Sequence, residues 1–262
     1  MGAAEAALIL LAGVVAGTIN TVVGSGTLVT FPTLLFFGYA PVTANVSNTI
    51  GLVAGGLTGS WGYRHELRGA GRTLRKWVPM SLLGGIAGAV LLLVLDPAAF
   101  QAVVPALIAL GVVLVAVGPR ITAWTSARRG DEAPMSVHDH TGSRIAVLMA
   151  CVFVTAVYGG YFGAAQGVIL MGLLTTLTSE SLQSLNAMKN VLTTIVNVVA
   201  AVTFVLVAPE QVNWAAAGLI AAGSLLGGVI GAKVGRRLPP NVLRAVIVVI
   251  GIVAIVRMVW FS

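Results

Sequence analysis

The chain alternates between long apolar stretches and a few short polar connections. No Asp, Glu, Lys or Arg occurs from Ala6 to Tyr63 or from Ile145 to Ser179. A helix needs about 20 predominantly apolar residues to cross the hydrocarbon core of a bilayer. These uncharged stretches are too long to be core helices of a soluble protein. The pattern therefore predicts an all-α polytopic membrane protein, embedded in a lipid bilayer.

Six apolar segments have the length of a full span, and two longer segments need a separate interpretation. The six expected spans are Ala44–Tyr63, Trp77–Leu95, Ala99–Gly118, Leu185–Val207, Val212–Ala232 and Leu243–Trp260. The two remaining segments, 6–38 and 145–179, stand at the head of each half of the chain. Each is interrupted by a polar, glycine-rich break, at residues 20–27 in the first and 159–167 in the second.

Only about a dozen apolar residues follow each break, over 28–39 and 168–177. At ~1.5 Å per residue they reach roughly 18 Å, which is short of the ~30 Å hydrocarbon core. The lengths favour a hairpin of half-helices in each head segment, with its bend inside the protein, over two full spans. Pro32 fits the first turns of the first returning arm.

Charge then orients the spans. The chain is 58% hydrophobic and 9% charged, with a formal net charge of +7. Thirteen of the fifteen Lys and Arg fall in three windows: 64–76, 120–144 and 233–244. The connections around Asp96 and Glu210 contain no basic residue. Because basic residues stay on the cytoplasmic side during insertion, the three windows are expected inside and the acidic connections outside.

An internal repeat agrees with these directions. The string from Leu82 to Ala89, LLGGIAGA, recurs as LLGGVIGA from Leu225 to Ala232, a shift of 143; upstream, a shift of 141 pairs Gly26 with Gly167 and Asn45 with Asn186. The first half begins outside and the second inside, so corresponding helices run in opposite directions. Such inverted repeats are typical of secondary transporters, whose site lies near the midplane. The expected domains are a first repeat over 1–118, a cytoplasmic linker over 119–143 and a second repeat over 144–262.

The glycines of the repeated string have a simpler explanation than a functional one, since small residues let membrane helices approach closely. Polar residues inside spans are costly and tend to mark pathways. Here they gather at the two breaks and at the helix starts that follow. The candidate substrate-binding residues are Asn20, Thr21, Gly24, Ser25, Gly26, Asn45, Asn48, Tyr161, Gln166, Asn186, Lys189 and Asn190. The structural alternative is that Ser and Thr cap the hairpins and Asn residues tie the half-helices together.

Lys189 is the only charge between Ser181 and Pro209. It either extends to the cytoplasmic surface or supplies the fixed positive charge that a substrate anion needs. Its counterpart at the shift of 141 is Asn48, so the chemistry would differ between the halves. No acidic residue lies deep in a span, and no acidic proton or sodium relay is evident. Whether a proton or sodium ion couples to transport stays open.

Other functional classes find little support. No surface combines basic and aromatic residues, so no nucleic acid is expected as a partner. His138-Asp139-His140 fits a solvated linker better than a metal site, and Cys151 fits a buried hydrophobe. Neither His nor acidic residues occur inside the bilayer, which argues against an enzyme. No metal and no cofactor are expected, and oligomeric state, including a homo-oligomer, is left open.

Two long motifs resemble those of a known family. The stretch GTINTVVGSGTLVTFPTLLFFGYAPVTANVSNTIGLVAGG, from Gly17, is similar to the opening signature of the TauE/SafE sulfite exporter family. YGGYFGAAQGVILMGLLTTL, followed by LNAMKN, is similar to its second repeat. The family's polar motif falls here on Asn20, Gly24, Ser25, Gly26, Pro32, Asn45, Ser47, Asn48, Gly159, Gly163, Gly167, Asn186, Lys189 and Asn190.

The resemblance implies a secondary transporter in a prokaryotic inner (plasma) membrane. Its substrates would be small sulfur-containing anions such as sulfite or organosulfonates. Transport of other small organic acids and an anion channel are the alternatives. Nothing in the motifs selects among these substrates.

Overall fold

Every regular element of the computed structural model is a helix within the described residues, which are 1–128, 142–178, 180–234 and 240–260. In chain order these elements are α1 (Ala3–Val22), α2 (Thr27–Phe36), α3 (Pro41–Gly62), α4 (Gly71–Val94), α5 (Pro97–Arg128), α6 (Gly142–Tyr161), α7 (Gln166–Leu177), α8 (Leu182–Val207), the 3-10 helix η2 (Pro209–Gln211), α9 (Trp214–Val234) and α10 (Pro240–Trp260). The prediction of an all-α chain is confirmed.

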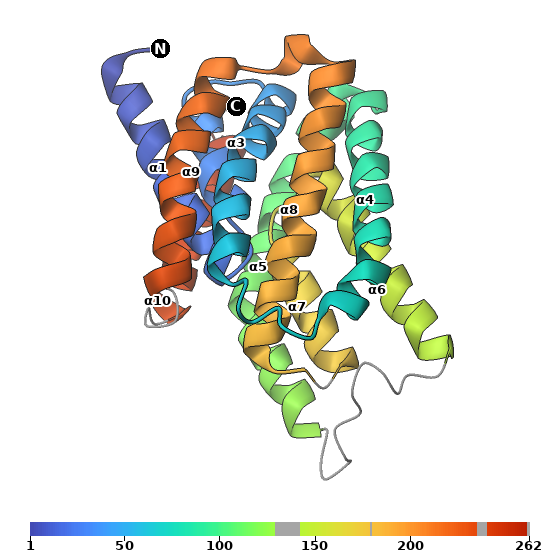
Figure 1. Ribbon diagram of the computed structural model, residues 1–262. Coiled ribbons are helices and arrows are strands. Elements are labelled where there is room, and N and C mark those ends of the chain that lie inside the picture. Colours follow the sequence, from blue (N-terminus) through green and yellow to red (C-terminus); the bar gives the residue numbers. More distant parts are fainter. Residues whose placement is uncertain (129–141, 179, 235–239, 261–262) are drawn as a thin grey trace.

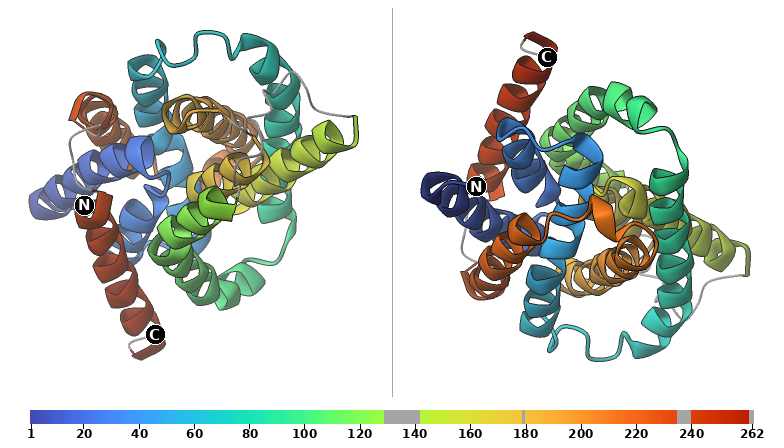
Figure 2. Two further views of the ribbon diagram at one scale, coloured as in Figure 1. Left: turned by 90° about the horizontal axis from the view of Figure 1, so that it is seen from below. Right: turned by 90° about the horizontal axis from the view of Figure 1, so that it is seen from above.

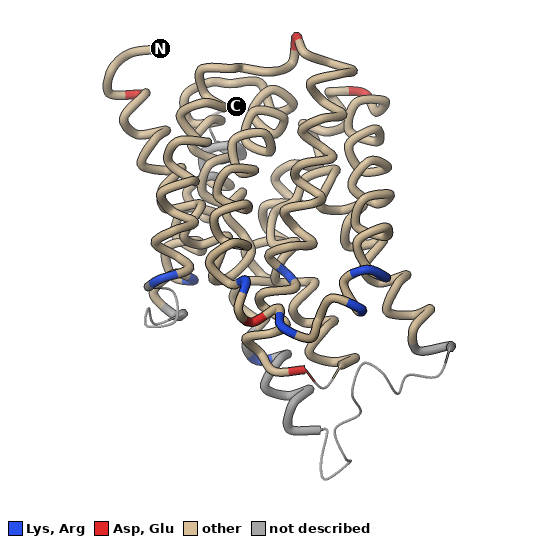
Figure 3. The backbone as a smooth tube through the Cα atoms, viewed as in Figure 1, with Lys and Arg blue, Asp and Glu red and all other residues tan. Residues whose placement is uncertain are grey.

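Within the described residues, five helices are long and apolar enough to cross a membrane: 3–22, 71–94, 97–118, 182–207 and 214–233. The helices run roughly side by side between two ends of the molecule (Figure 1). Lys and Arg gather toward the lower end in that view, and the upper end carries only acidic charges within the described part of the chain (Figure 3). Charge is thus segregated along the direction of the helices.

Each head segment is a hairpin of one long and one short helix. α1 and α6 have 20 residues each, whereas α2 has 10 and α7 has 12. At ~1.5 Å per residue the short arms measure roughly 15–18 Å, about half of a ~30 Å core. The first hairpin starts and ends at the upper end of the molecule and the second at the lower end (Figure 1). Pro32 lies inside α2 as its sixth residue.

Glycine faces bring the two hairpins close to helices of the opposite half. α1 packs on α9, and α6 packs on α4. A Cβ at Gly227 of α9 would lie 2.1 Å from the carbonyl oxygen of Val14, and one at Gly88 of α4 would lie 2.0 Å from that of Val157. The repeated glycine string therefore serves close helix packing, as its simpler explanation predicted.

α3 and α8 lie between these outer pairs (Figure 2). α3 packs on α9 and α8 packs on α4, while α3 and α8 also contact each other. The hydroxyl of Ser224 in α9 donates to the carbonyl of Gly51 at 2.7 Å and accepts from the amide of Gly55 at 3.1 Å. This fully buried serine joins α9 to α3.

Some element boundaries differ from the expected ones. α5 continues to Arg128, ten residues beyond the expected end at Gly118, and α6 begins at Gly142. Part of the segment 119–143, expected as a linker, is therefore helical. α3 begins at Pro41, earlier than expected, because proline is well suited to the first position of a helix. His138 and His140 lie outside the described residues.

Candidate functional site

The two breaks meet inside the molecule. The amide of Gly167 donates a hydrogen bond of 2.9 Å to the carbonyl of Gly24. A Cβ at Gly24 would lie 2.6 Å from the Cα of Gly167, and a Cβ at Gly167 would lie 2.5 Å from the Cα of Gly24. Gly24 also has φ +90, which side-chain-bearing residues rarely adopt. Only glycine at both positions lets the tips of the hairpins touch.

Lys189 lies beside this contact with its side chain fully buried. Its Nζ donates to the carbonyl oxygens of Asn20 at 3.4 Å and Thr21 at 3.3 Å, in the last turn of α1. Asn190 donates from Nδ2 to the same Thr21 carbonyl at 3.2 Å. The carbonyls at a helix C-terminus carry a partial negative charge, which favours a cation there. Among the described residues, the hydrogen-bond partners of this ammonium are neutral.

The position of Lys189 bears on one of its two interpretations, the extension of its side chain to the cytoplasmic surface. Lys189 lies seven residues after the first residue of α8, about two turns from the N-terminal end of this helix. Its buried ammonium points toward the end of α1, so the structure does not show the alternative in which the side chain extends to the cytoplasmic surface.

Around α2, polar side chains bond mainly to one another. Asn48 of α3 accepts a short hydrogen bond from the hydroxyl of Thr30 and donates from Nδ2 to the Oγ1 of Thr27 at 3.3 Å. Asn20 accepts from the amide of Gly26 at 3.5 Å, across the bend. These bonds hold the start of α2 against α1 and α3. Thr30 was absent from the sequence-based candidates, although its spacing from Thr27 places both on one face of α2.

A second group of residues lies where α6 ends. Asn45 of α3 donates from Nδ2 to the carbonyl of Tyr161 at 2.9 Å. The Tyr161 ring packs edge-on against Phe100, with the centroids 5.6 Å apart. The buried side-chain amide of Gln166 fills the space beside Gly159, where a Cβ would lie 2.3 Å from the Gln166 Cδ. The structure thus brings three further candidates to the second break.

Two buried polar atoms near the breaks have no hydrogen-bond partner among the described residues. They are the hydroxyl Oγ of Ser25 and the amide Oδ1 of Asn45, and each residue is only 1% exposed. Leaving a buried polar group unpaired costs about 1–3 kcal/mol. A bound water or a ligand at these atoms would supply the missing partner.

Some predicted residues lie apart from this cluster. Asn186 is half-buried in α8 and has no recorded side-chain bond within the described chain. Ser47 belongs to the family's polar motif. Its hydroxyl accepts a hydrogen bond of 2.9 Å from the backbone amide of Asn213, just before α9. Cys151 is a half-buried free thiol. The described segments contain no group of three or more His, Cys, Asp and Glu that could hold a metal ion.

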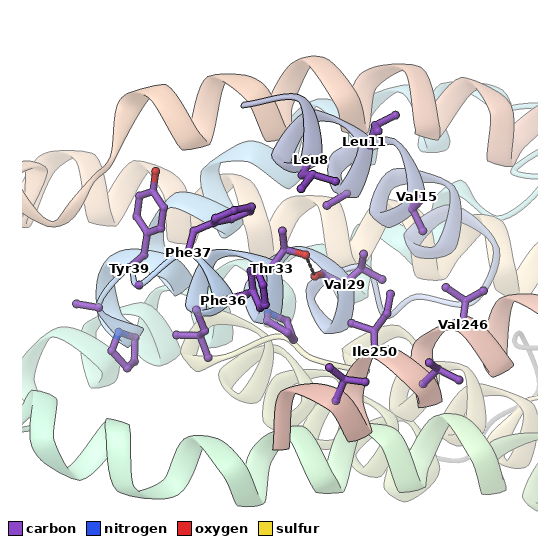
Figure 4. A pocket seen from close by; sticks show the side chains of 18 of the residues that line it. Leu8, Leu11, Val15, Val29, Thr33, Phe36, Phe37, Tyr39, Val246 and Ile250 are labelled. Atoms are coloured by element: carbon purple, nitrogen blue, oxygen red, sulfur yellow. Dashed lines mark hydrogen bonds between the residues drawn. The ribbon is translucent and has the colours of Figure 1, made fainter. Parts of the chain in front are cut away.

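A separate groove of about 830 Å³ lies among α1, α2 and α10 (Figure 4). Its lining is mostly apolar and includes Leu8, Leu11 and Val15 of α1 with Val246 and Ile250 of α10. None of the candidate substrate-binding residues lines it. The groove is therefore distinct from the polar cluster at the breaks.

Comparison with known proteins identifies the family to which the chain is related. The profile described as Sulfite exporter TauE/SafE matches residues 9–258. A "Probable membrane transporter protein" of Haemophilus influenzae (strain Rd) is 27% identical over 263 residues, which cover 97% of this chain and 94% of the relative. "Probable membrane transporter protein YfcA" of Escherichia coli (strain K12) is 21% identical over 255 residues, which cover 97% and 90%. No solved structure gives a significant match. The chain belongs to the TauE/SafE sulfite exporter family of membrane transporters.

Proposed function

We propose that this chain is a secondary transporter that exports small sulfur-containing anions, such as sulfite or an organosulfonate. The observation that carries the proposal is the buried ammonium of Lys189 at the meeting point of the hairpins, with neutral carbonyl partners in the described chain. Burying an ion without a counter-charge is costly. A bound oxyanion supplies that counter-charge, so the site favours an anion over a neutral or cationic substrate.

Backbone groups add to the proposed anion site. α2 and α7 begin at the two breaks, and the N-terminus of a helix carries a partial positive charge. Ser25, whose buried hydroxyl has no hydrogen-bond partner within the described chain, lies two residues before the start of α2. Sulfite and sulfonate groups present several acceptor oxygens, which match a hydroxyl and an ammonium beside two positive helix ends.

The proposed transport mechanism is alternating access between two inverted repeats, over 1–118 and 144–262, joined by a linker over 119–143. The contacts between helices support the repeats. A shift of one half onto the other exchanges α1 with α6, α3 with α8 and α4 with α9. Under this exchange the α1–α9 contact becomes the α6–α4 contact, and α3–α9 becomes α8–α4. A site between such repeats can open to either side by movement of one against the other.

The proposed location is the prokaryotic inner membrane, with the basic end and the linker in the cytoplasm. Cysteine labelling tests this orientation in intact cells. In a Cys151→Ser background, Asp96→Cys should react with a membrane-impermeant maleimide, whereas Arg68→Cys should react only after the cells are opened. The reverse pattern would show that the chain is inserted the other way round.

Calorimetry on purified protein tests the anion site. Sulfite, a short sulfonate, sulfate and a carboxylate are titrated into the wild type, Lys189→Met and Lys189→Arg. We expect binding of a sulfur oxyanion that weakens by roughly 10- to 100-fold in Lys189→Met, since hydrogen bonds to charged groups contribute about 1.5–3 kcal/mol. Lys189→Arg keeps the charge and should retain more of the affinity.

Proteoliposomes then distinguish a transporter from a channel. A transporter gives saturable uptake and counterflow of labelled sulfite, whereas a channel gives neither. If no sulfur oxyanion binds or moves, the proposed substrate class is wrong. If affinity survives in Lys189→Met, the ammonium is not the anion anchor.

A further inference from the structure

We infer that the molecule binds a sodium ion at the C-terminal end of α6, between the carbonyl oxygens of the second break and the side chain of Asn45. The site comes from a comparison of the two helix ends that meet at the breaks. As a coupling ion for transport it rests on the proposed function, but its binding can be measured with no transported anion present.

The ends of α1 and α6 both place the partial negative charge of helix C-terminal carbonyls in a buried region. α1 and α6 both end inside the molecule, and each exposes C-terminal carbonyls to a buried region rather than to water. At the end of α1, the ammonium of Lys189 meets the carbonyls of Asn20 and Thr21. The shift of 141 takes Asn20 to Tyr161 and Lys189 to Asn48. The end of α6 therefore has the corresponding carbonyls, but the position that corresponds to Lys189 holds the neutral side chain of Asn48.

Asn45 supplies an unused oxygen at this second helix end. Its Nδ2 donates to the carbonyl of Tyr161 at 2.9 Å, which fixes the amide beside the last turn of α6. Its Oδ1, on the same amide carbon, is buried and has no hydrogen-bond partner within the described residues. This atom can only accept, so it suits a cation or a donor and repels an anion.

Further oxygens surround the space left by Gly163. A Cβ at this glycine would lie 3.0 Å from the carbonyl oxygen of Gly159 and 3.8 Å from the Oγ1 of Thr27. The glycine has φ +77, so the chain turns sharply there without a side chain to fill the space. The ligands we assign are Asn45 Oδ1, the carbonyls of Gly159 and Tyr161, and the hydroxyl of Thr27.

The chemistry of these ligands selects a hard monovalent cation. All four are neutral oxygens, which suit a hard ion, and none carries a charge that would balance a divalent one. The carbonyls at the C-terminal ends of broken helices coordinate Na⁺ in several transporter folds. The ion at α6 would thus play the electrostatic part that the Lys189 ammonium plays at α1, and each broken helix would end on one positive charge.

Thermal unfolding of the purified protein tests the site without any sulfur anion. Melting temperatures are measured in sodium, potassium and choline chloride at equal ionic strength. We expect a saturable rise in sodium alone, on the order of 2–4 °C once sodium exceeds its Kd several-fold. Asn45→Leu should abolish this rise. Thr203→Val, which removes a hydroxyl that donates to the Val199 carbonyl within α8, should keep it.

Asn45→Asp tests the same atom if the leucine variant does not fold. It keeps the shape of the side chain and adds a negative charge, so sodium should bind at least about tenfold more tightly. The inference is overturned if the melting temperature of the wild type shows no sodium-specific rise. This is the result expected if a water molecule occupies the site. It is also overturned if Asn45→Leu keeps the full rise, or if Asn45→Asp leaves the affinity unchanged. A failure of sulfite binding leaves these results unaffected, so the two proposals fail separately.

Discussion

Replacing Gly227 by alanine adds one methyl group at the point where α9 crosses α1. The new Cβ would lie 2.1 Å from the carbonyl oxygen of Val14 and 2.8 Å from the amide nitrogen of Thr18, whereas ordinary contact begins at 3.4 Å. Both atoms belong to the backbone of α1, so no side chain can rotate away. The two helices would have to separate by about 1.3 Å, the difference between 3.4 and 2.1 Å.

The effect of this separation on the free energy of unfolding can be estimated from its parts. Overpacking typically costs about 1–3 kcal/mol, and the 3.1 Å bond from the hydroxyl of Thr18 to the Gly227 carbonyl would weaken as well. The higher helix propensity of alanine stabilises the folded state by roughly 1 kcal/mol and offsets part of this loss. We expect a net loss of about 1–3 kcal/mol in the free energy of unfolding. The melting temperature should fall by on the order of 2–4 °C for each kcal/mol.

Gly218 provides the matched control in the same helix. A Cβ there would have no neighbouring atom within 4 Å. Gly218→Ala should therefore leave the melting temperature unchanged or raise it slightly. Thermal unfolding of the two purified variants in one detergent makes the comparison. If Gly227→Ala is as stable as Gly218→Ala, the close approach of α1 and α9 does not limit stability and the argument fails.

Two further predictions concern polar side chains. Thr30→Val leaves the buried amide of Asn48 without the hydroxyl that donates to it, so the free energy of unfolding should fall by about 1–3 kcal/mol; an equal fall in Thr203→Val would contradict this. At the upper end of the molecule, partial burial, the 3.0 Å hydrogen bond to Glu5 and the charge of Glu5 raise the pKa of Tyr39. The resulting contribution to stability is complete below the ordinary tyrosine pKa of about 10 and is lost as pH rises through the raised value. Glu5→Gln should lower the pKa of Tyr39 when tyrosinate absorbance is followed against pH, and an unchanged titration would contradict the assignment.

Much of the fold follows from local properties of the sequence. The uncharged stretches predict the helices, because their lengths match a bilayer. The polar breaks and the short apolar runs after them predict the two hairpins, since ten or twelve residues cannot cross the core. The positions of the basic windows in the sequence predict which helix ends lie at the same end of the molecule. The charge distribution agrees with this prediction (Figure 3).

The contacts within the candidate site depend on tertiary packing that no local pattern contains. Lys189 and the carbonyls it meets are 168 and 169 residues apart, so the sequence left its direction open. Ser47 lies between Asn45 and Asn48 in the same polar run, yet it faces the loop before α9. A polar residue near a helix start can face the break or a neighbouring loop, and only the packing of that helix decides.

The bond between Thr18 and Gly227 joins residues 209 positions apart. A ribosome adds about 5–20 residues per second, so the partner of the first helix emerges on the order of 10–40 s after that helix. For this time the glycine face of α1 lacks the helix that covers it in the finished protein. The packing of α1 is thus completed long after α1 itself has been made. Truncated chains that end before α9 should therefore be recognised as unfinished by the quality control of the membrane.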